Sequence, residues 1–92
     1  MGKLKIVYSS QFKKDYKKVK KQNKDIGKLS VVTEKLAAKE RLDAKYRDHP
    51  LTGSWKGFRD CHLEPDWILI YQSTADTLIL ARTGSHSELF KK

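Results

Sequence analysis

The sequence predicts an α+β domain in which two amphipathic helices precede three consecutive strands. Three observations lead to this fold class. Residues 4–9 are rich in β-branched and aromatic side chains, apolar residues recur at helical spacing through residues 10–40, and strand-like segments follow from residue 55. The expected order is β-α-α-β-β-β, a small and largely antiparallel sheet with a helical hairpin packed on one face.

The chain has 92 residues, enough for one modest hydrophobic core, so we expect residues 1–92 to form a single domain. Its one cysteine, Cys61, cannot form an internal disulfide, which fits a reducing compartment. No apolar run approaches the roughly 20 residues that a bilayer crossing needs, and no signal-peptide pattern is present. These features predict a cytoplasmic protein without membrane contact.

The first two expected elements are a strand over residues 4–9 and a helix that Ser9 or Ser10 caps. The apolar positions of this helix are Phe12, Tyr16 and Val19. Because they lie four and then three residues apart, they share one helix face, and lysines occupy the other.

A second amphipathic helix is expected from residue 26 to about Glu40, after a short break at residues 21–25. Its apolar positions are Ile26, Leu29, Val32 and Leu36. The short break predicts a helical hairpin. A long ordered loop then follows, in which Pro50 and Gly53 disfavour regular structure.

Three strands are expected at residues 55–63, 67–72 and 77–82. Pro65 presets the turn between the first two. The segment "WILIY" is apolar on both faces, as a central strand should be. A final helical turn is expected to begin near Ser85.

The positive charge is concentrated near the start of the chain. The formal net charge is +9, and residues 1–25 carry nine lysines against two aspartates. Such a face attracts polyanions, with binding that weakens as salt rises. The candidate RNA-docking or ribosome-docking residues are Lys13, Lys14, Lys17, Lys18, Lys20 and Lys21. The same charge equally fits a solvated helix face or a site for an acidic protein.

Strand order predicts that polar and aromatic side chains from distant segments meet at one sheet edge. His62 ends the first of the three strands, and Asp66 or Trp67 should face it across the turn, because antiparallel strands are joined end to start. Arg82 ends the third strand at the same edge. Two further members follow in the tail and one precedes in the loop: His86, Phe90 and His49.

This group suits RNA cleavage without a metal or another cofactor. A base must activate the 2′-hydroxyl, an acid must protonate the leaving 5′-oxygen, and a cation must stabilise the phosphorane. Histidine titrates near neutral pH, so it can serve as either acid or base. Arg82 can hold the phosphate through two N–H donors. Trp67 and Phe90 offer ring faces for unpaired bases.

Each of these residues also has a structural interpretation. The two aromatic rings can belong to the core, and Arg82 can form a surface ion pair with Asp60 or Glu64. Two of the histidines could bind Zn²⁺ together with Asp66. However, neither an HExxH motif nor paired CxxC motifs are present.

Two segments resemble the YafQ group of the RelE-type bacterial toxins. They are "YRDHPLTGSWKGFRDCHLEPDWILIYQ", residues 46–72, and "LARTGSHSELF", residues 80–90, whereas residues 1–40 match in pattern only. The resemblance implies the RelE-like fold and cleavage of mRNA in the ribosomal A site. It also implies a cognate antitoxin that wraps around the toxin, and binding of operator DNA only as the toxin–antitoxin complex.

The resemblance also implies roles for individual residues. His86 would be the general acid, Asp66 a proton-transfer residue, and Arg82 the phosphate stabiliser. The histidines of "DHPL" and "CHLEPDW" would also lie in the active site: His49 and His62. The rings of "EPDW" and "ELF" would contact the substrate: Trp67 and Phe90.

The sequence therefore predicts a ribosome-dependent mRNA endoribonuclease that uses no metal and is the toxin of a type II toxin–antitoxin pair. The alternative is a non-catalytic nucleic-acid-binding module that regulates transcription with a protein partner. The lysines support that alternative equally well, whereas the histidines and the arginine do not. A metal-dependent nuclease is a third interpretation. The general base is left open among Asp66, His49 and His62.

Overall fold

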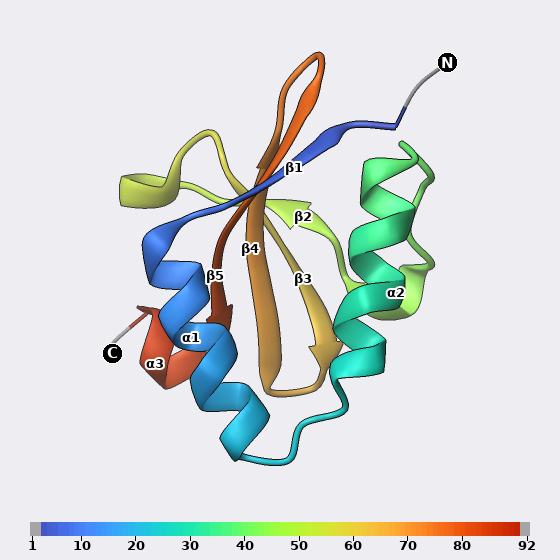
Figure 1. Ribbon diagram of the computed structural model, residues 1–92. Helices are drawn as coiled ribbons and strands as arrows, with labels where there is room; N and C mark the ends of the chain where they lie inside the picture. The colour runs from blue at the N-terminus through green and yellow to red at the C-terminus, as the bar shows by residue number, and fades with distance from the viewer. Residues whose placement is uncertain (1–2, 91–92) are drawn as a thin grey trace.

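The computed structural model describes residues 3–90, which form a five-stranded sheet with helices packed against it (Figure 1). The elements in chain order are β1 (Lys5–Tyr8), α1 (Ser10–Lys21), α2 (Ile26–Ala37), the 3₁₀ helix η1 (Ala44–Tyr46), β2 (His49–Pro50), the 3₁₀ helix η2 (Gly53–Trp55), β3 (Arg59–Glu64), β4 (Trp67–Ser73), β5 (Thr77–Gly84) and α3 (His86–Phe90). The strand order is β1-β5-β4-β3-β2; β1 is parallel to β5 and the other neighbours are antiparallel. The predicted α+β class is confirmed.

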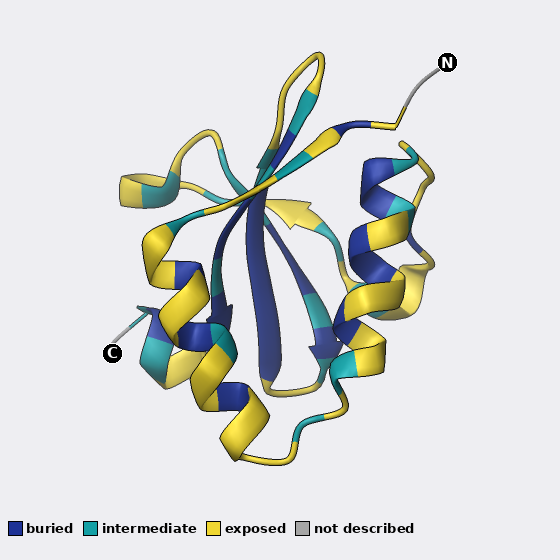
Figure 2. Ribbon diagram, in the orientation of Figure 1, coloured by how far each residue is buried: buried dark blue, intermediate teal, exposed yellow. Residues whose placement is uncertain are grey.

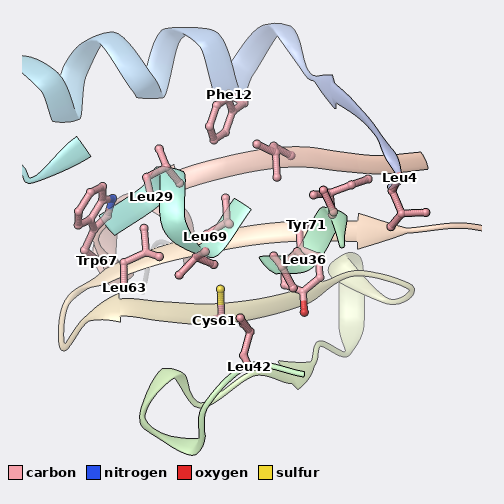
Figure 3. Close-up of a cluster of buried hydrophobic side chains, with 14 of the residues drawn as sticks. Leu4, Phe12, Leu29, Leu36, Leu42, Cys61, Leu63, Trp67, Leu69 and Tyr71 are labelled. Atoms are coloured by element: carbon pink, nitrogen blue, oxygen red, sulfur yellow. The ribbon is translucent and has the colours of Figure 1, made fainter. Parts of the chain in front are cut away.

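The central strand β4 is buried along almost all of its length (Figure 2). Successive side chains of a strand point to opposite faces of the sheet. Trp67, Leu69 and Tyr71 belong to the core under the helices (Figure 3), while Ile68 and Ile70 belong to a second apolar cluster. We call these two surfaces of the sheet the helix face and the far face.

The two long helices cover the helix face, as predicted. Phe12 and Val19 of α1 and Leu29 of α2 are buried in the same core cluster as β4. Ser9 caps α1, because its Oγ accepts a hydrogen bond from the Phe12 N–H at 2.9 Å. Lys39, with φ 61°, follows the end of α2, so this helix is shorter than predicted. Within residues 3–90, no helix has the length and apolar character that spanning a membrane requires.

The segment before β3 differs most from the sequence prediction. The expected loop contains the short strand β2, in which His49 pairs with Asp60. The predicted strand over residues 55–63 begins only at Arg59, because η2 and Gly57, with φ 95°, turn the chain first. At the other side of the sheet, β5 continues two residues beyond its predicted end, to Gly84.

Trp67 provides a test of the core. Its indole Nε1–H donates to Thr83 Oγ1 at 2.9 Å, and that hydroxyl donates to the Ile68 carbonyl at 2.9 Å. Both hydrogen bonds are buried. Trp67→Phe keeps a ring in the core but leaves Thr83 without its donor and creates a cavity. We expect the free energy of unfolding in urea to fall by about 1–3 kcal/mol.

Trp55→Phe is the matched control for Trp67→Phe, because Trp55 is only half-buried and packs on the far face. It should cost less than about 1 kcal/mol. Equal losses for the two variants would contradict the role of the Trp67–Thr83 hydrogen bond.

Candidate active site

Four aromatic rings form a continuous row: His49, His62, His86 and Phe90. Their successive centroids are separated by 6.5, 5.8 and 5.5 Å. His62 points to the far face, because its cross-strand partner is Ile68 of the far-face cluster. The His49 and His86 side chains are 51% and 58% exposed, so the row is open to a ligand. The structure thus brings together three histidines and one phenylalanine that the sequence assigned to one site.

Asp66 belongs to the turn between β3 and β4, and its side chain lies beside His86, the first residue of α3. Its Oδ1 accepts the His86 backbone N–H at 2.9 Å and lies 3.9 Å from His86 Nδ1. The prediction that His62 faces Asp66 or Trp67 across the turn was wrong. His62 pairs with Ile68, and an irregularity between His62 and Glu64 shifts the register at the strand end.

A reciprocal set of hydrogen bonds fixes α3, and with it His86. The Ser85 N–H donates to Glu88 Oε1 at 2.9 Å, while the Glu88 N–H donates to Ser85 Oγ at 3.3 Å. Glu88 also pairs with Lys18 of α1. A Cβ at Gly84 would lie 3.0 Å from Glu88 Oε1, so glycine suits this close approach. The Lys18 ammonium and the Ser85 N–H lower the pKa of Glu88 to about 2.

Arg82 is anchored by a residue that the sequence analysis did not assign to the site. Its Nε and Nη2 donate to the two oxygens of Asp15 at 3.0 and 2.9 Å. The Thr83 N–H also donates to Asp15, at 3.2 Å. This ion pair raises the pKa of Arg82 above its usual value. Asp60 and Glu64, the partners considered from sequence, are not the ones used.

The cross-strand partner of Arg82 is Ile70 of the far-face cluster, while its guanidinium reaches Asp15 of α1. A guanidinium carries five N–H donors, and the Asp15 bonds occupy two. The remaining donors suit a phosphate.

Asp60 is a buried carboxylate beneath the histidine row, and the sequence analysis did not assign it to the site either. It is 2% exposed, and its Oδ1 lies 3.2 Å from His49 Nδ1. Within residues 3–90, no group is aligned to hydrogen-bond this oxygen. Burial raises the pKa of Asp60, and the charges of His49, His62 and His86 oppose that shift.

The tautomer of His49 follows from its contacts. Its Nδ1 lies 2.7 Å from the Arg47 carbonyl oxygen, which can only accept. Nδ1 therefore carries a hydrogen, and in the neutral ring Nε2 is the nitrogen with the lone pair.

Trp67 does not belong to the site, which corrects its predicted contact with the substrate. The residue is 0% exposed and packs among the helix-face core residues (Figure 3). Strand alternation places it on the opposite side of the sheet from His62 and Ile68. A buried ring offers no face to a base.

The six candidate docking lysines of α1 are all exposed. Lys18 differs from the other five because it pairs with Glu88.

Metal binding was the alternative interpretation of the histidines. Among the residues that the structure describes, no group of three or more His, Cys, Asp or Glu side chains is arranged to hold a metal ion.

Asp15→Asn should lower the free energy of unfolding by about 1–3 kcal/mol, because it weakens the four hydrogen bonds that Asp15 accepts, two of them from a charged guanidinium. Urea denaturation measures this loss. Asp43→Asn is the matched control, since Asp43 is exposed and makes no capping hydrogen bond. Losses of equal size would contradict the anchoring role of Asp15.

The lowered pKa of Glu88 predicts a dependence of stability on pH. A carboxyl whose folded-state pKa is depressed stabilises the fold above its usual value near 4.5, and that contribution disappears as pH falls toward about 2. The difference in melting temperature between the native protein and Glu88→Gln should therefore be constant above about pH 5.5 and shrink between pH 4.5 and 2. A difference that stays constant over the whole range would contradict the ion pair.

The sequence and the fold are similar to those of known proteins. Residues 4–91 match the family described as the bacterial toxin of the type II toxin–antitoxin system, YafQ. The chain is 51% identical over 86 residues to the mRNA interferase toxin YafQ of Escherichia coli strain K12, covering 92% of this chain and 94% of the relative.

Solved structures show the same fold. The toxin in the E. coli DinJ-YafQ toxin–antitoxin complex superposes with a TM-score of 0.88 at 49% identity, covering 96% of this chain and 98% of that one. A metal-bound toxin from Helicobacter pylori superposes with a TM-score of 0.89 at 48% identity, covering 95% and 99%. On these grounds, the chain belongs to the YafQ family of type II toxin–antitoxin toxins.

Proposed function

We propose that this protein is a ribosome-dependent mRNA endoribonuclease, an mRNA interferase that inhibits translation as the toxin of a type II toxin–antitoxin pair. The observation that carries the proposal is the exposed row His49–His62–His86–Phe90, together with Arg82, which pairs across the strands with Ile70 of the far-face cluster. The row supplies imidazoles, which commonly act as general acids and bases, and Arg82 supplies a fixed cation.

His86 suits the general acid. Its backbone is held by Asp66 and by the Ser85–Glu88 hydrogen bonds, while its imidazole remains 58% exposed. It would protonate the leaving 5′-oxygen. Phe90, whose ring centroid is 5.5 Å from that of His86, would orient the adjacent base.

The general base is best assigned to the His49–His62 pair. In-line displacement places the attacking and leaving oxygens on opposite sides of the phosphorus. Asp66 accepts a hydrogen bond from the His86 backbone, so it lies on the same side of the phosphorus as the proposed acid, His86. His62 lies 5.8 Å from His86 between ring centroids and has His49 on its other side. Attack by the 2′-hydroxyl gives a 2′,3′-cyclic phosphate and a 5′-hydroxyl, with Asp66 positioning the acid.

The exposed lysines of α1 would dock on ribosomal RNA, with binding that weakens as salt rises. The E. coli relative is found in a complex with DinJ, so we infer a cognate antitoxin for this chain as well. Operator DNA would be bound only by the toxin–antitoxin complex. The site of action would be the cytoplasm.

Two other functions make different predictions. A non-catalytic nucleic-acid-binding module is supported by the lysine face of α1, and it would leave messages intact. A metal-dependent nuclease is relevant because the H. pylori relative is metal-bound. A chelator that removes transition metals but leaves ribosomal Mg²⁺ in place would stop such an enzyme, whereas we expect cleavage to continue.

The central test is His86→Ala. It should lower the single-turnover rate of cleavage of ribosome-bound mRNA by about 10²- to 10⁴-fold, because the leaving oxygen loses its acid. Primer extension on a defined message measures the cleaved fraction. Induction of the native protein should arrest growth, and the variant should relieve that arrest.

Ser87→Ala is the matched control, since Ser87 is an exposed neighbour on α3. It should cleave at the native rate. If His86→Ala has the native fold and also cleaves at the native rate, His86 is not the acid.

A further inference from the structure

A groove opens at the edge of the sheet, beside the histidine row. It lies between the N-terminal half of α2, η1 and the end of β3, and its volume is about 660 Å³. The chain after α2 runs back beside that helix before it enters β2 (Figure 1). Small-molecule sites typically measure about 300–1,000 Å³, so the groove is large enough for a nucleotide. We call it the edge groove; its main lining residues are Lys28, Lys45, Tyr46, Arg47, His62 and Glu64.

The charge of the edge groove favours an anion. Lys28, Lys45 and Arg47 line it, against the carboxylates of Asp25 and Glu64. Both carboxylates already have partners. Asp25 accepts the Gly27 N–H at 3.0 Å, and Glu64 accepts from Lys28 at 3.0 Å. Lys45 of η1 and Arg47, which follows η1, are therefore the cations that could bind a phosphate.

Tyr46 gives the groove a flat wall. It is half-buried and packs against the helix-face core, which holds the ring in place. The Lys45 ammonium lies over this ring, 5.3 Å from its centroid. A base that stacks on this face would take the place of the Lys45 ammonium, which could then bind the phosphate of the same nucleotide.

The groove is continuous with the candidate active site. His62 lines the groove and is also a member of the histidine row. Arg47 connects them a second time, because its backbone has φ 50° and its carbonyl accepts from His49 Nδ1 at 2.7 Å. A single strand of RNA whose scissile phosphate lies at the histidines has this groove directly beside it.

We propose that the edge groove binds a nucleotide of the RNA strand adjacent to the scissile phosphate, with its base stacked on Tyr46 and its phosphate held by Lys45 and Arg47. This inference rests on the proposed function, since it takes the cut strand to lie along the histidine row. It adds a binding subsite to that function and a residue, Tyr46, that affects which bases are accepted.

The first experiment is an NMR titration of the intact protein. The probe is a mixed-sequence octaribonucleotide that carries 2′-O-methyl groups throughout, so that attack by a 2′-hydroxyl is blocked. We expect the amides of Lys45, Tyr46 and Arg47 to shift in the same titration as those of His62 and His86.

The possible results separate the subsite from the function. Shifts at the histidines without shifts at residues 45–47 overturn the subsite and leave the proposed function standing. Shifts at residues 45–47 without shifts at the histidines overturn the claim that one RNA strand occupies both the edge groove and the histidine row. They also count against RNA binding along the row. No shift anywhere at millimolar probe overturns the subsite.

The second experiment measures cleavage of ribosome-bound mRNA by Tyr46→Leu, which keeps an apolar side chain against the core but removes the ring face. We expect KM to rise about 5- to 100-fold, because one stacked base is lost, with kcat changed less than about twofold. A purely structural role would lower the melting temperature without this split between KM and kcat. Native KM in a folded Tyr46→Leu variant overturns the stacking.

Arg47→Asn tests the phosphate contact. Asparagine tolerates the left-handed backbone that Arg47 adopts, so the substitution removes the charge with little strain. The matched control is Lys39→Asn. Lys39 is also a cation with positive φ, at 61°, but it lies at the other end of α2. We expect a raised KM for Arg47→Asn alone, and equal values for both variants would overturn the contact.

Discussion

The burial of β4 on both of its faces is the constraint on which the rest of the structure depends. Trp67, Leu69 and Tyr71 fill the core under the helices, while Ile68 and Ile70 support the far face. Because side chains alternate along a strand, one register sets both faces at once. A slip by one residue would place the Trp67 indole beneath the histidine row, and the helices would then contact Ile68 and Ile70 instead of Trp67, Leu69 and Tyr71. The buried Trp67–Thr83 hydrogen bond specifies the register against that slip.

The same constraint explains which parts of the molecule could be predicted from the sequence. Amphipathic spacing was sufficient for α1 and α2, and the continuous apolar run was sufficient for a central strand. That run is apolar at every position, however, so nothing in it indicates which alternate set faces the helices. Trp67 was assigned to the substrate from its place at the strand end and from the family resemblance, although it lies in the core. The short strand β2 was missed because its two residues, His49 and Pro50, become a strand only by pairing with β3.

Carboxylates from distant segments position the candidate site, and this part is hardest to read from sequence. Asp15 holds Arg82 across 67 residues of chain, and Asp66 holds the backbone of His86 across 20. Asp15 did leave a signal, since it falls on the same face of α1 as Phe12 and Val19, where a charged residue needs a buried partner. Asp60 is a different case. Its buried oxygen lacks an aligned donor within residues 3–90, and burial raises its pKa, while the charges of the three nearby histidines oppose that shift.

Helix α1 is where these constraints converge. Its apolar face packs on the sheet through Phe12 and Val19, its Asp15 anchors Arg82, and its Lys18 pairs with the glutamate that caps the helix carrying His86. The exposed face of the same helix carries the lysines expected to meet RNA. A displacement of α1 by any partner would therefore disturb Arg82 and His86, the proposed phosphate-binding residue and the proposed acid, together. In the proposed function, docking and chemistry share one helix, so a polyanion bound by these lysines would be held at a defined position relative to the histidine row.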